Sequence, residues 1–166
     1  MDLNKLYSLQ KKLDEKINEN HNLNNQDLLT KKILALSVEV AELANETRCF
    51  KFWSIKNSSP KNIILEEFVD CLHFILSIGI DLKYYDISFE DIKINDVYDE
   101  KDMSYCFLDL MNSINNFRKS LCKSNYLNVF INFISLGNKL GLDRYEIEDA
   151  YLKKNSINHA RQKEGY

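Results

Sequence analysis

Acidic side chains recur at helical spacing in two neighbouring apolar segments of the chain. The first segment, "LALSVEVAELANETRCFKFW", runs from Leu34 to Trp53. At about 100° per residue, Glu39, Glu42 and Glu46 fall within one narrow sector of a helix. Leucines lie beside that sector, so the carboxylates stand at the edge of the apolar stripe rather than on a purely solvated face.

The next apolar segment repeats this pattern. Glu67 and Asp70 share a sector with apolar side chains, and Glu66 lies on its flank. Buried carboxylates are costly unless they are paired or bind a cation. If the two acidic faces meet, oxygen ligands alone would select Mg²⁺ or Mn²⁺. A solvated face is the usual interpretation of one ExxE pair, but the repeat favours a metal site. Asp70 and His73 also resemble half of a di-iron motif, whose second half is missing.

The C-terminal stretch "YLKKNSINHARQKEGY" supplies positive charge and amides. Six of its polar residues project within about one third of a helical circumference: Tyr151, Lys154, Asn155, Asn158, Arg161 and Gln162. Such donors suit phosphate oxygens. The alternative is an exposed polar stripe without a ligand. An acidic metal site combined with a cationic helix favours a metal-bound polyphosphate.

Apolar periodicity predicts a helical protein. Helices are expected over about 3–18, 27–48, 61–78, 103–121 and 126–140, and from 144 onward. Only four Gly and one Pro occur, which disfavours sheets joined by tight turns. Ser59 is expected to cap the third helix with Pro60 at its first position, and Gly79 to end it. We therefore predict an all-α bundle of about six helices, in one domain spanning residues 1–166.

Composition excludes several classes of protein. The net charge of −3 provides no basic surface for nucleic acid. No apolar stretch approaches 18 residues and no signal peptide is recognisable, so no membrane association is expected. The four cysteines form no CxxC pair, which argues against a zinc or redox motif. We expect a soluble cytoplasmic protein.

The motifs together resemble those of a known family. "LQKKLD" around Gln10, "VEVAELANETRCFKFWS", "ILEEFVDCLHFILSIGI" and the C-terminal stretch occur in the order of the dimeric all-α dUTP diphosphatases. These enzymes belong to the helical NTP pyrophosphatase superfamily, with the MazG-like enzymes and dCTPases. The resemblance covers 1–80 and 143–166, whereas 81–142 matches no motif and corresponds to the family's variable helical region. It implies a homodimer that hydrolyses dUTP, and dUDP, to dUMP with Mg²⁺, limiting uracil incorporation into DNA.

The resemblance also implies roles for individual residues. The metal ligands would be Glu39, Glu42, Glu67 and Asp70, with Glu42, aided by Glu39, orienting the attacking water. The phosphate-binding residues would be Lys154, Asn155, Asn158, Arg161 and Gln162, joined by Lys51. The uracil and deoxyribose would lie against Gln10, Asn45, Trp53, His73 and Phe74. Some relatives carry Asn where this chain has Asp14, which leaves the contact of that position with the base open.

Three other functions stay open at this point. A related pyrophosphohydrolase would act on dCTP or a modified nucleotide. A phage-type dUTPase would also bind a repressor protein through the acidic, Tyr-rich segment 83–102, which includes Tyr84, Tyr85 and Tyr98. A metal-storage bundle would bind iron. The homodimer has separate support, because the apolar faces of 103–121 and 126–140 exceed what one six-helix core needs.

Overall fold

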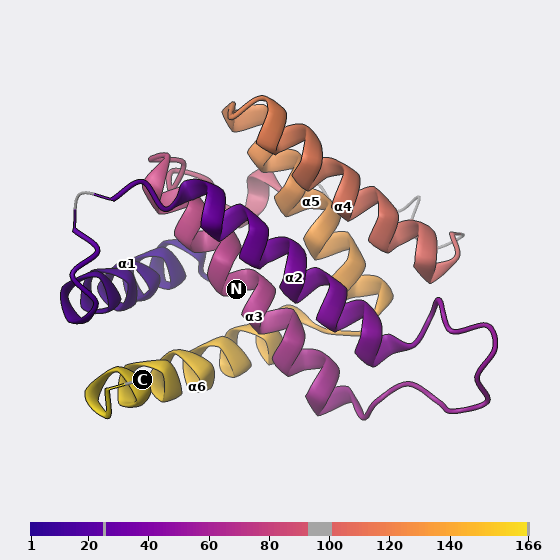
Figure 1. The fold of residues 1–166 in the computed structure, drawn as a ribbon. Helices are drawn as coiled ribbons and strands as arrows, with labels where there is room; N and C mark the ends of the chain where they lie inside the picture. The colour runs from indigo at the N-terminus through magenta and orange to yellow at the C-terminus, as the bar shows by residue number, and fades with distance from the viewer. Residues whose placement is uncertain (25, 93–100, 166) are drawn as a thin grey trace.

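The computed structural model describes residues 1–24, 26–92 and 101–165, and these residues contain helices and no strands. The helices are α1 (Leu3–Asn20), α2 (Leu29–Thr47), α3 (Lys61–Asp81), α4 (Met103–Lys119), α5 (Lys123–Lys139) and α6 (Arg144–Lys163), with a short 3₁₀ turn, η1 (Phe89–Asp91) (Figure 1). The predicted all-α architecture is confirmed. None of the described helices combines the length and apolarity that crossing a membrane requires.

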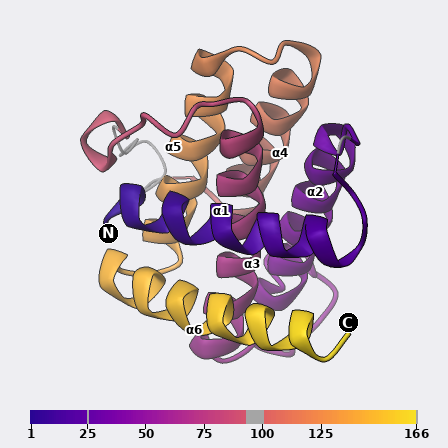
Figure 2. The ribbon, with the colours of Figure 1, turned by 90° about the vertical axis from the view of Figure 1, so that its left-hand side faces the viewer.

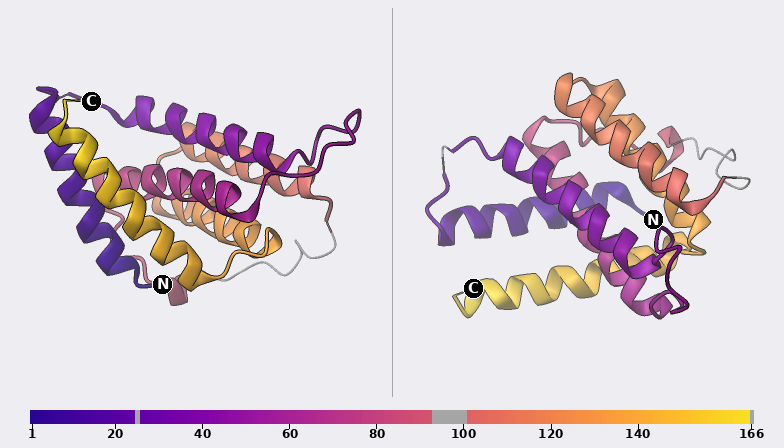
Figure 3. Two further views of the ribbon diagram at one scale, coloured as in Figure 1. Left: turned by 90° about the horizontal axis from the view of Figure 1, so that it is seen from below. Right: turned by 45° about the vertical axis from the view of Figure 1, so that its right-hand side comes forward.

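The helices form two hairpins and one crossing pair. Helices α2 and α3 make one antiparallel hairpin and α4 and α5 the other (Figures 1 and 3). Helices α1 and α6 lie side by side across α3 (Figure 2). They run parallel, because Lys5 pairs with Glu148 near their N-terminal ends while Asn20 bonds Gln162 near their C-terminal ends. The two ends of the sequence are thereby brought to the same face of α3.

Helix α3 is the centre of the bundle. It packs against α1, α2, α5 and α6. From Phe68 to Gly79 nearly every residue is buried, which is typical of a helix enclosed on all sides. His73 and Ser77 are the polar residues of this buried stretch. Their polar atoms must find partners inside the protein, and this requirement shapes the candidate site.

The predicted end of the third helix at Gly79 is wrong. The helix continues to Asp81. Gly79 lies where α3 approaches α5, and a Cβ atom there would be 2.3 Å from the Tyr126 hydroxyl oxygen. That hydroxyl donates to the Ile75 carbonyl at 2.9 Å and accepts from the Tyr7 hydroxyl at 2.9 Å. Gly79 therefore serves close packing rather than helix termination.

The start of α3 also differs from the prediction, whereas the start of α6 agrees with it. Pro60 is the N-cap of α3, without a side-chain capping bond. The Ser59 hydroxyl instead donates to the Glu46 carboxylate, and its backbone N–H donates to the Glu46 carbonyl at 2.9 Å. Helix α6 begins at Arg144, after Asp143 caps it. Ser59 thus ties the α2–α3 loop back to α2.

The close approach at Gly79 gives a test. Gly79→Ala in a helix interior normally stabilises by about 1 kcal/mol. Here we expect the free energy of unfolding to fall by about 2 kcal/mol, because the new methyl group displaces the Tyr126 hydroxyl. Urea unfolding followed by circular dichroism measures the change. The same substitution in a Tyr126→Phe background should cost less, and equal costs in both backgrounds would contradict this packing argument.

Candidate active site

Three carboxylates from α2 and α3 form a cluster. Glu39 of α2 and Glu67 and Asp70 of α3 each place one oxygen so that all three atoms lie within 4.8 Å of one another. All three side chains are partly buried. The structure therefore brings Glu39 together with two acids that follow it by 28 and 31 positions in the sequence, at a spacing that suits several ligands of one cation.

The negative charge of this cluster is poorly compensated. Burial, followed by the charges of Asp70, Glu42 and Glu67, raises the pKa of Glu39 from 4.5 to about 7. Burial and the same kind of repulsion raise the pKa of Glu67. Among the described residues, neither Glu39 nor Glu67 has a side-chain hydrogen bond or an ion pair. These oxygens fit a bound cation, which would remove the repulsion.

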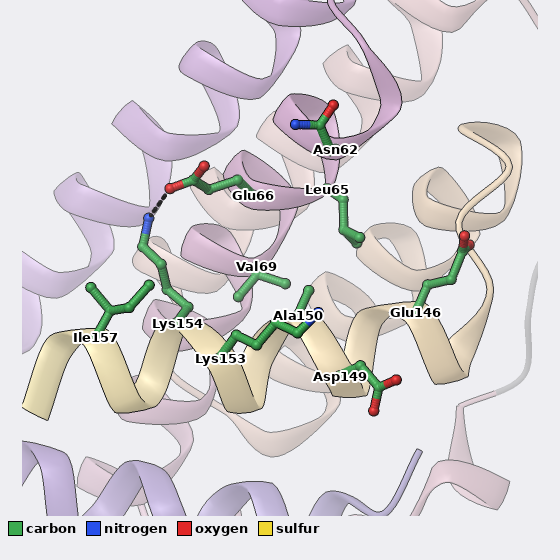
Figure 4. A pocket seen from close by; sticks show the side chains of 10 residues that line it. All are labelled: Asn62, Leu65, Glu66, Val69, Glu146, Asp149, Ala150, Lys153, Lys154 and Ile157. Atoms are coloured by element: carbon green, nitrogen blue, oxygen red, sulfur yellow. Dashed lines mark hydrogen bonds and ion pairs between the residues drawn. The ribbon is translucent and has the colours of Figure 1, made fainter.

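Lys154 of α6 reaches the edge of the cluster. Its Nζ lies 2.6 Å from Asp70 Oδ2 and 2.9 Å from Glu66 Oε1. Burial raises the pKa of Asp70, although the Lys154 hydrogen bond and charge act against this. On its outer side Lys154 lines a pocket of about 400 Å³ between α3 and α6, whose floor includes Val69 and Ala150 (Figure 4). A cation on α6 is therefore held beside the acids by α3.

A second cavity borders the same cluster. Its volume is about 200 Å³, and α1, α2, α3 and α6 contribute to its walls. Gln10, His73 and Phe74 line it, together with Asp70 and Asn158. Asp70 belongs both to this cavity and to the carboxylate cluster. A ligand in the cavity would therefore lie next to the acids.

Hydrogen bonds organise the floor of this cavity. Gln10 Oε1 is 2.7 Å from His73 Nδ1 and accepts from the Tyr151 hydroxyl at 2.8 Å. Gln10 Nε2 donates to Asp14 Oδ1 at 2.7 Å. The His73 ring stacks on Tyr151 at a centroid distance of 4.3 Å. Burial, with the charge of Lys154, lowers the pKa of His73 to about 3, so the ring is neutral near pH 7.

The family match identifies what such an arrangement does. The sequence model of the dUTPase family matches residues 2–166. The chain belongs to the dUTPase family. It is a dUTP diphosphatase, an enzyme that hydrolyses dUTP. The match includes 81–142, where no motif was recognisable in the sequence. No individually curated protein matches the chain.

The family context gives the acidic cluster a meaning. dUTPases of this family generally depend on a metal ion, and the acids of α2 and α3 could bind one. Glu39 alone among the α2 acids belongs to the cluster. Glu42 is exposed, but its charge raises the pKa of Glu39 and Glu67, so it lies near them. Glu46 bonds Ser59 and shapes the loop instead.

Some of the residues on α6 predicted to bind phosphate lie near the acids and the cavity, whereas Gln162 lies away from them. Asn158 lines the cavity, and the charge of Arg161 reaches Asp70, whose pKa it lowers. Asn155 is buried, and its Nδ2 has no hydrogen-bond partner within the described part of the chain. Gln162 lies farther along, where its backbone and side-chain oxygens accept bonds from Asn20. The end of α6 is therefore tied to α1 rather than to the acids.

Three predicted residues do not line the cavity. Asn45 is near the end of α2, and Lys51 and Trp53 lie in the loop that follows. The Lys51 ammonium donates to the Asn45 side chain. The Trp53 side chain is 65% exposed and meets the ring of Phe52 edge-on at 5.0 Å. Within one chain, this loop forms an exposed aromatic surface.

Sequence reasoning overlooked two members of the cavity network. The sequence pattern indicates no hydrogen-bond partner for Asp14, and it places Tyr151 only in the polar stripe of the C-terminal helix. Both had a signal, because Asp14 follows Gln10 by one helical turn and Tyr151 precedes Asn155 by one turn. Asp14 bonds Gln10 on its own helix, but its other partners lie on α2 and α3, and Tyr151 bonds Gln10 from α6. These contacts between helices are not visible in the sequence.

The segment proposed as a docking surface is only partly described. Residues 93–100, including Tyr98, lie outside the described ranges. The Tyr84 hydroxyl donates to the Leu121 carbonyl at 2.9 Å, which joins this segment to the end of α4. Tyr85 is exposed. Repressor binding through this segment stays a prediction.

The raised pKa of Glu39 predicts that the stability of the metal-free protein depends on pH. With its pKa raised from 4.5 to about 7, the folded protein binds this proton more tightly than the unfolded chain does. The metal-free protein therefore loses stability as pH rises through that interval. Between pH 4.5 and about 7, the free energy of unfolding of Glu39→Gln should rise by roughly 1 kcal/mol relative to that of the unmodified protein. This figure allows for solvent screening of a half-exposed side chain.

Urea unfolding of both proteins in a chelator measures this difference. The comparison is needed because His73 acts oppositely: its pKa, lowered from 6.5 to about 3, makes stability rise with pH between those values. The difference between the unfolding free energies of the two proteins no longer contains the contribution of His73. A difference that stays constant with pH would show that Glu39 titrates normally.

Proposed function

We propose that this dUTPase hydrolyses dUTP, and also dUDP, to dUMP with Mg²⁺ as its metal ion. The observation that carries the proposal is the cluster of Glu39, Glu67 and Asp70 beside both Lys154 and the cavity of about 200 Å³. Oxygen ligands favour a hard divalent ion. The reaction would supply dUMP and limit the uracil available for incorporation into DNA.

The acids would hold the ion. Glu39, Glu67 and Asp70 would bind Mg²⁺, with Glu42 completing the set from its position one turn after Glu39. When bound, Mg²⁺ supplies charge neutralisation at the phosphoryl oxygens and a more acidic water. Glu42 is exposed and so is able to accept a proton from the attacking water. Such positioning and charge compensation are the main requirements of phosphoanhydride hydrolysis.

The basic residues would bind the phosphates. Lys154 is within hydrogen-bond distance of Asp70, so it lies at the border between ion and phosphate. Arg161 is on the same face of α6 and adds a guanidinium suited to phosphate oxygens. Asn155, Asn158 and Gln162 would contribute amide donors, and Lys51 a further ammonium.

The cavity would hold the nucleoside. Phe74 offers a flat ring, and Gln10 and His73 offer polar atoms. Because Asp70 borders the cavity, a nucleoside bound there would direct its phosphates toward the cluster. Asn45, near the end of α2, and Trp53, in the loop that follows, would approach the base. A tight pocket would exclude the 5-methyl group of thymine, and mismatched amide polarity would disfavour cytosine.

A nucleotide panel tests the activity. We expect dUTP and dUDP to be hydrolysed to dUMP with Mg²⁺, dCTP and dTTP to be poor substrates, and a chelator to abolish turnover until Mg²⁺ is restored. Glu39→Gln and Glu42→Gln should each lower kcat by a factor on the order of 10² or more. Chromatographic separation of the products measures both effects.

A matched substitution serves as the control. Glu15→Gln changes an exposed glutamate on α1 and should leave turnover unchanged. Strong dCTP hydrolysis with little dUTP hydrolysis would favour the related pyrophosphohydrolase. Full activity of Glu39→Gln would refute the assignment of the cluster.

We also propose that two copies of the chain associate through α2 and α4. Leu34 and Val38 are 65% and 47% exposed, and with the exposed Ala41 they form a stripe along α2 at the spacing of a helix–helix contact. Tyr105 and Leu108 are exposed on α4, which packs on α2. Apolar stripes of this kind are typical of self-association.

Sedimentation velocity tests the homodimer. We expect the unmodified chain to sediment as a dimer and Val38→Glu to shift it to the 19.6 kDa monomer, because a charge would be buried at the contact. Tyr145→Glu is the control, at an aromatic residue on α6 that is 65% exposed, against 47% for Val38. A monomeric unmodified chain would contradict the proposal.

A further inference from the structure

One ring nitrogen of His73 has no hydrogen-bond partner in the described part of the chain. His73 is only 6% exposed and lines the cavity beside Asp70. Its Nδ1 contacts Gln10 Oε1, whereas its Nε2 is buried without a hydrogen bond within the described residues. A buried polar atom without a partner is destabilising, so its persistence calls for an explanation such as a ligand.

The partner of Nδ1 determines what Nε2 can do. An amide oxygen only accepts hydrogen bonds, so the 2.7 Å contact with Gln10 Oε1 requires a proton on Nδ1. Since the low pKa of His73 keeps the ring neutral, Nε2 carries no proton. Nε2 is therefore an acceptor, available to a donor that enters the cavity.

The orientation of the Gln10 amide depends in turn on Asp14. A carboxylate accepts and does not donate, so it faces Gln10 Nε2, at 2.7 Å, and turns Oε1 toward His73. The Ser77 hydroxyl donates to the other Asp14 oxygen at 2.6 Å, and the Lys32 ammonium is 3.8 Å from it. Burial raises the pKa of Asp14, and these two groups act against that rise.

Lys32 is itself shared with a second carboxylate. Its Nζ lies 2.7 Å from Asp81 Oδ2, and the two pairs anchor α2 to α1 and to the end of α3. Charged side chains of three helices are therefore linked beside the cavity, although Asp81 itself does not line it. Only Asp14 among these carboxylates contacts Gln10.

We propose that Asp14 is a positioning residue that, through Gln10, fixes the His73 tautomer with Nδ1 protonated, so that Nε2 accepts a hydrogen bond from the substrate. The proposal rests on the proposed function for the identity of that substrate, a pyrimidine deoxynucleotide. In a deoxyuridine nucleotide, the donors are the 3′-hydroxyl of the sugar and the N3–H of uracil. Asp14 thereby sets the polarity of the cavity through its hydrogen bond to Gln10.

This relay assigns Gln10 a different role from direct reading of the uracil edge. Its oxygen already has two partners, the His73 ring and the Tyr151 hydroxyl. Its Nε2 has one acceptor, Asp14. At most one amide hydrogen is left for a nucleotide, so Gln10 acts chiefly by orienting His73.

The tautomer is measurable without any substrate. Long-range ¹H–¹⁵N correlation spectra of protein labelled at its three histidines distinguish protonated from unprotonated ring nitrogens. His73→Phe assigns the His73 signals and keeps an aromatic ring against Tyr151. We expect Nδ1 of His73 to be protonated and Nε2 unprotonated at neutral pH. A protonated Nε2 in the unmodified protein would overturn the proposal.

Three substitutions test the part played by Asp14. Asp14→Leu removes the acceptor and should give a mixture of His73 tautomers. Asp14→Asn should restore a single tautomer, because its amide oxygen accepts from Gln10 while its nitrogen donates to Ser77. Asp81→Asn is the matched control, since it alters the other Lys32 pair without contacting Gln10. An unchanged tautomer in Asp14→Leu would refute the relay, and if this variant does not fold, the unmodified protein still gives the decisive spectrum.

Substrate analogues test the acceptor role of Nε2. A 3′-deoxy analogue of dUTP and an N3-methyl analogue each remove one donor. We expect one of them to lose at least about tenfold in kcat/KM with the unmodified enzyme, mainly through KM, and to lose nothing further in His73→Phe. Equal use of both analogues and dUTP would refute the acceptor role. Absence of dUTP hydrolysis would refute the proposed function and leave the tautomer measurement standing.

Discussion

The repulsion among the acids of α2 and α3 is the constraint around which this bundle is organised. One oxygen of each of three carboxylates lies within 4.8 Å of the other two. Their mutual repulsion opposes the folding that brings them together. The opposing force is the apolar packing of the same two helices, in which Leu36, Val40 and Leu43 are buried against α3. Each such side chain contributes about 1.5–3 kcal/mol. Core residues therefore hold the acids in place, and a cation would remove the strain.

Helix α6 neutralises part of the negative charge of these acids and leaves the rest without a positive partner in the described structure. Lys154 pairs with Asp70 and Glu66, but the described structure gives Glu39 and Glu67 no cation of their own. This division suits a site for a metal-bound polyphosphate. The ion belongs with the unpaired oxygens, and the phosphates belong beside the ammonium. Because α6 comes from the far end of the chain and runs parallel to α1, the site forms only when the bundle closes.

The cavity next to the cluster is organised by a network of hydrogen bonds. Hydrogen bonds fix the direction of its polar atoms, and these bonds begin at the Asp14 carboxylate. Asp14 orients Gln10, and Gln10 orients His73. A site with fixed donors and acceptors discriminates between bases and sugars through unmatched polar groups. The acidic cluster supports the chemistry, and this network supports the choice of substrate.

Much of this architecture was determined by the sequence alone. Helical periodicity located six helices, and the spacing of Glu39, Glu67 and Asp70 indicated acids at the edge of apolar stripes. The local pattern misplaced Ser59 and Gly79, because a contact with Glu46 and the approach of Tyr126 decide their roles. These partners lie on other elements, beyond the reach of periodicity.

Only the tertiary structure decided which polar atoms meet. The sequence placed Glu39 and Glu42 alike, yet helix packing puts the first in the cluster and leaves the second exposed. It also left Asp14 unassigned, because the partner of a carboxylate depends on which helices cross above it. Periodicity shows which face of a helix is buried, whereas hydrogen bonds between helices depend on their crossing and register.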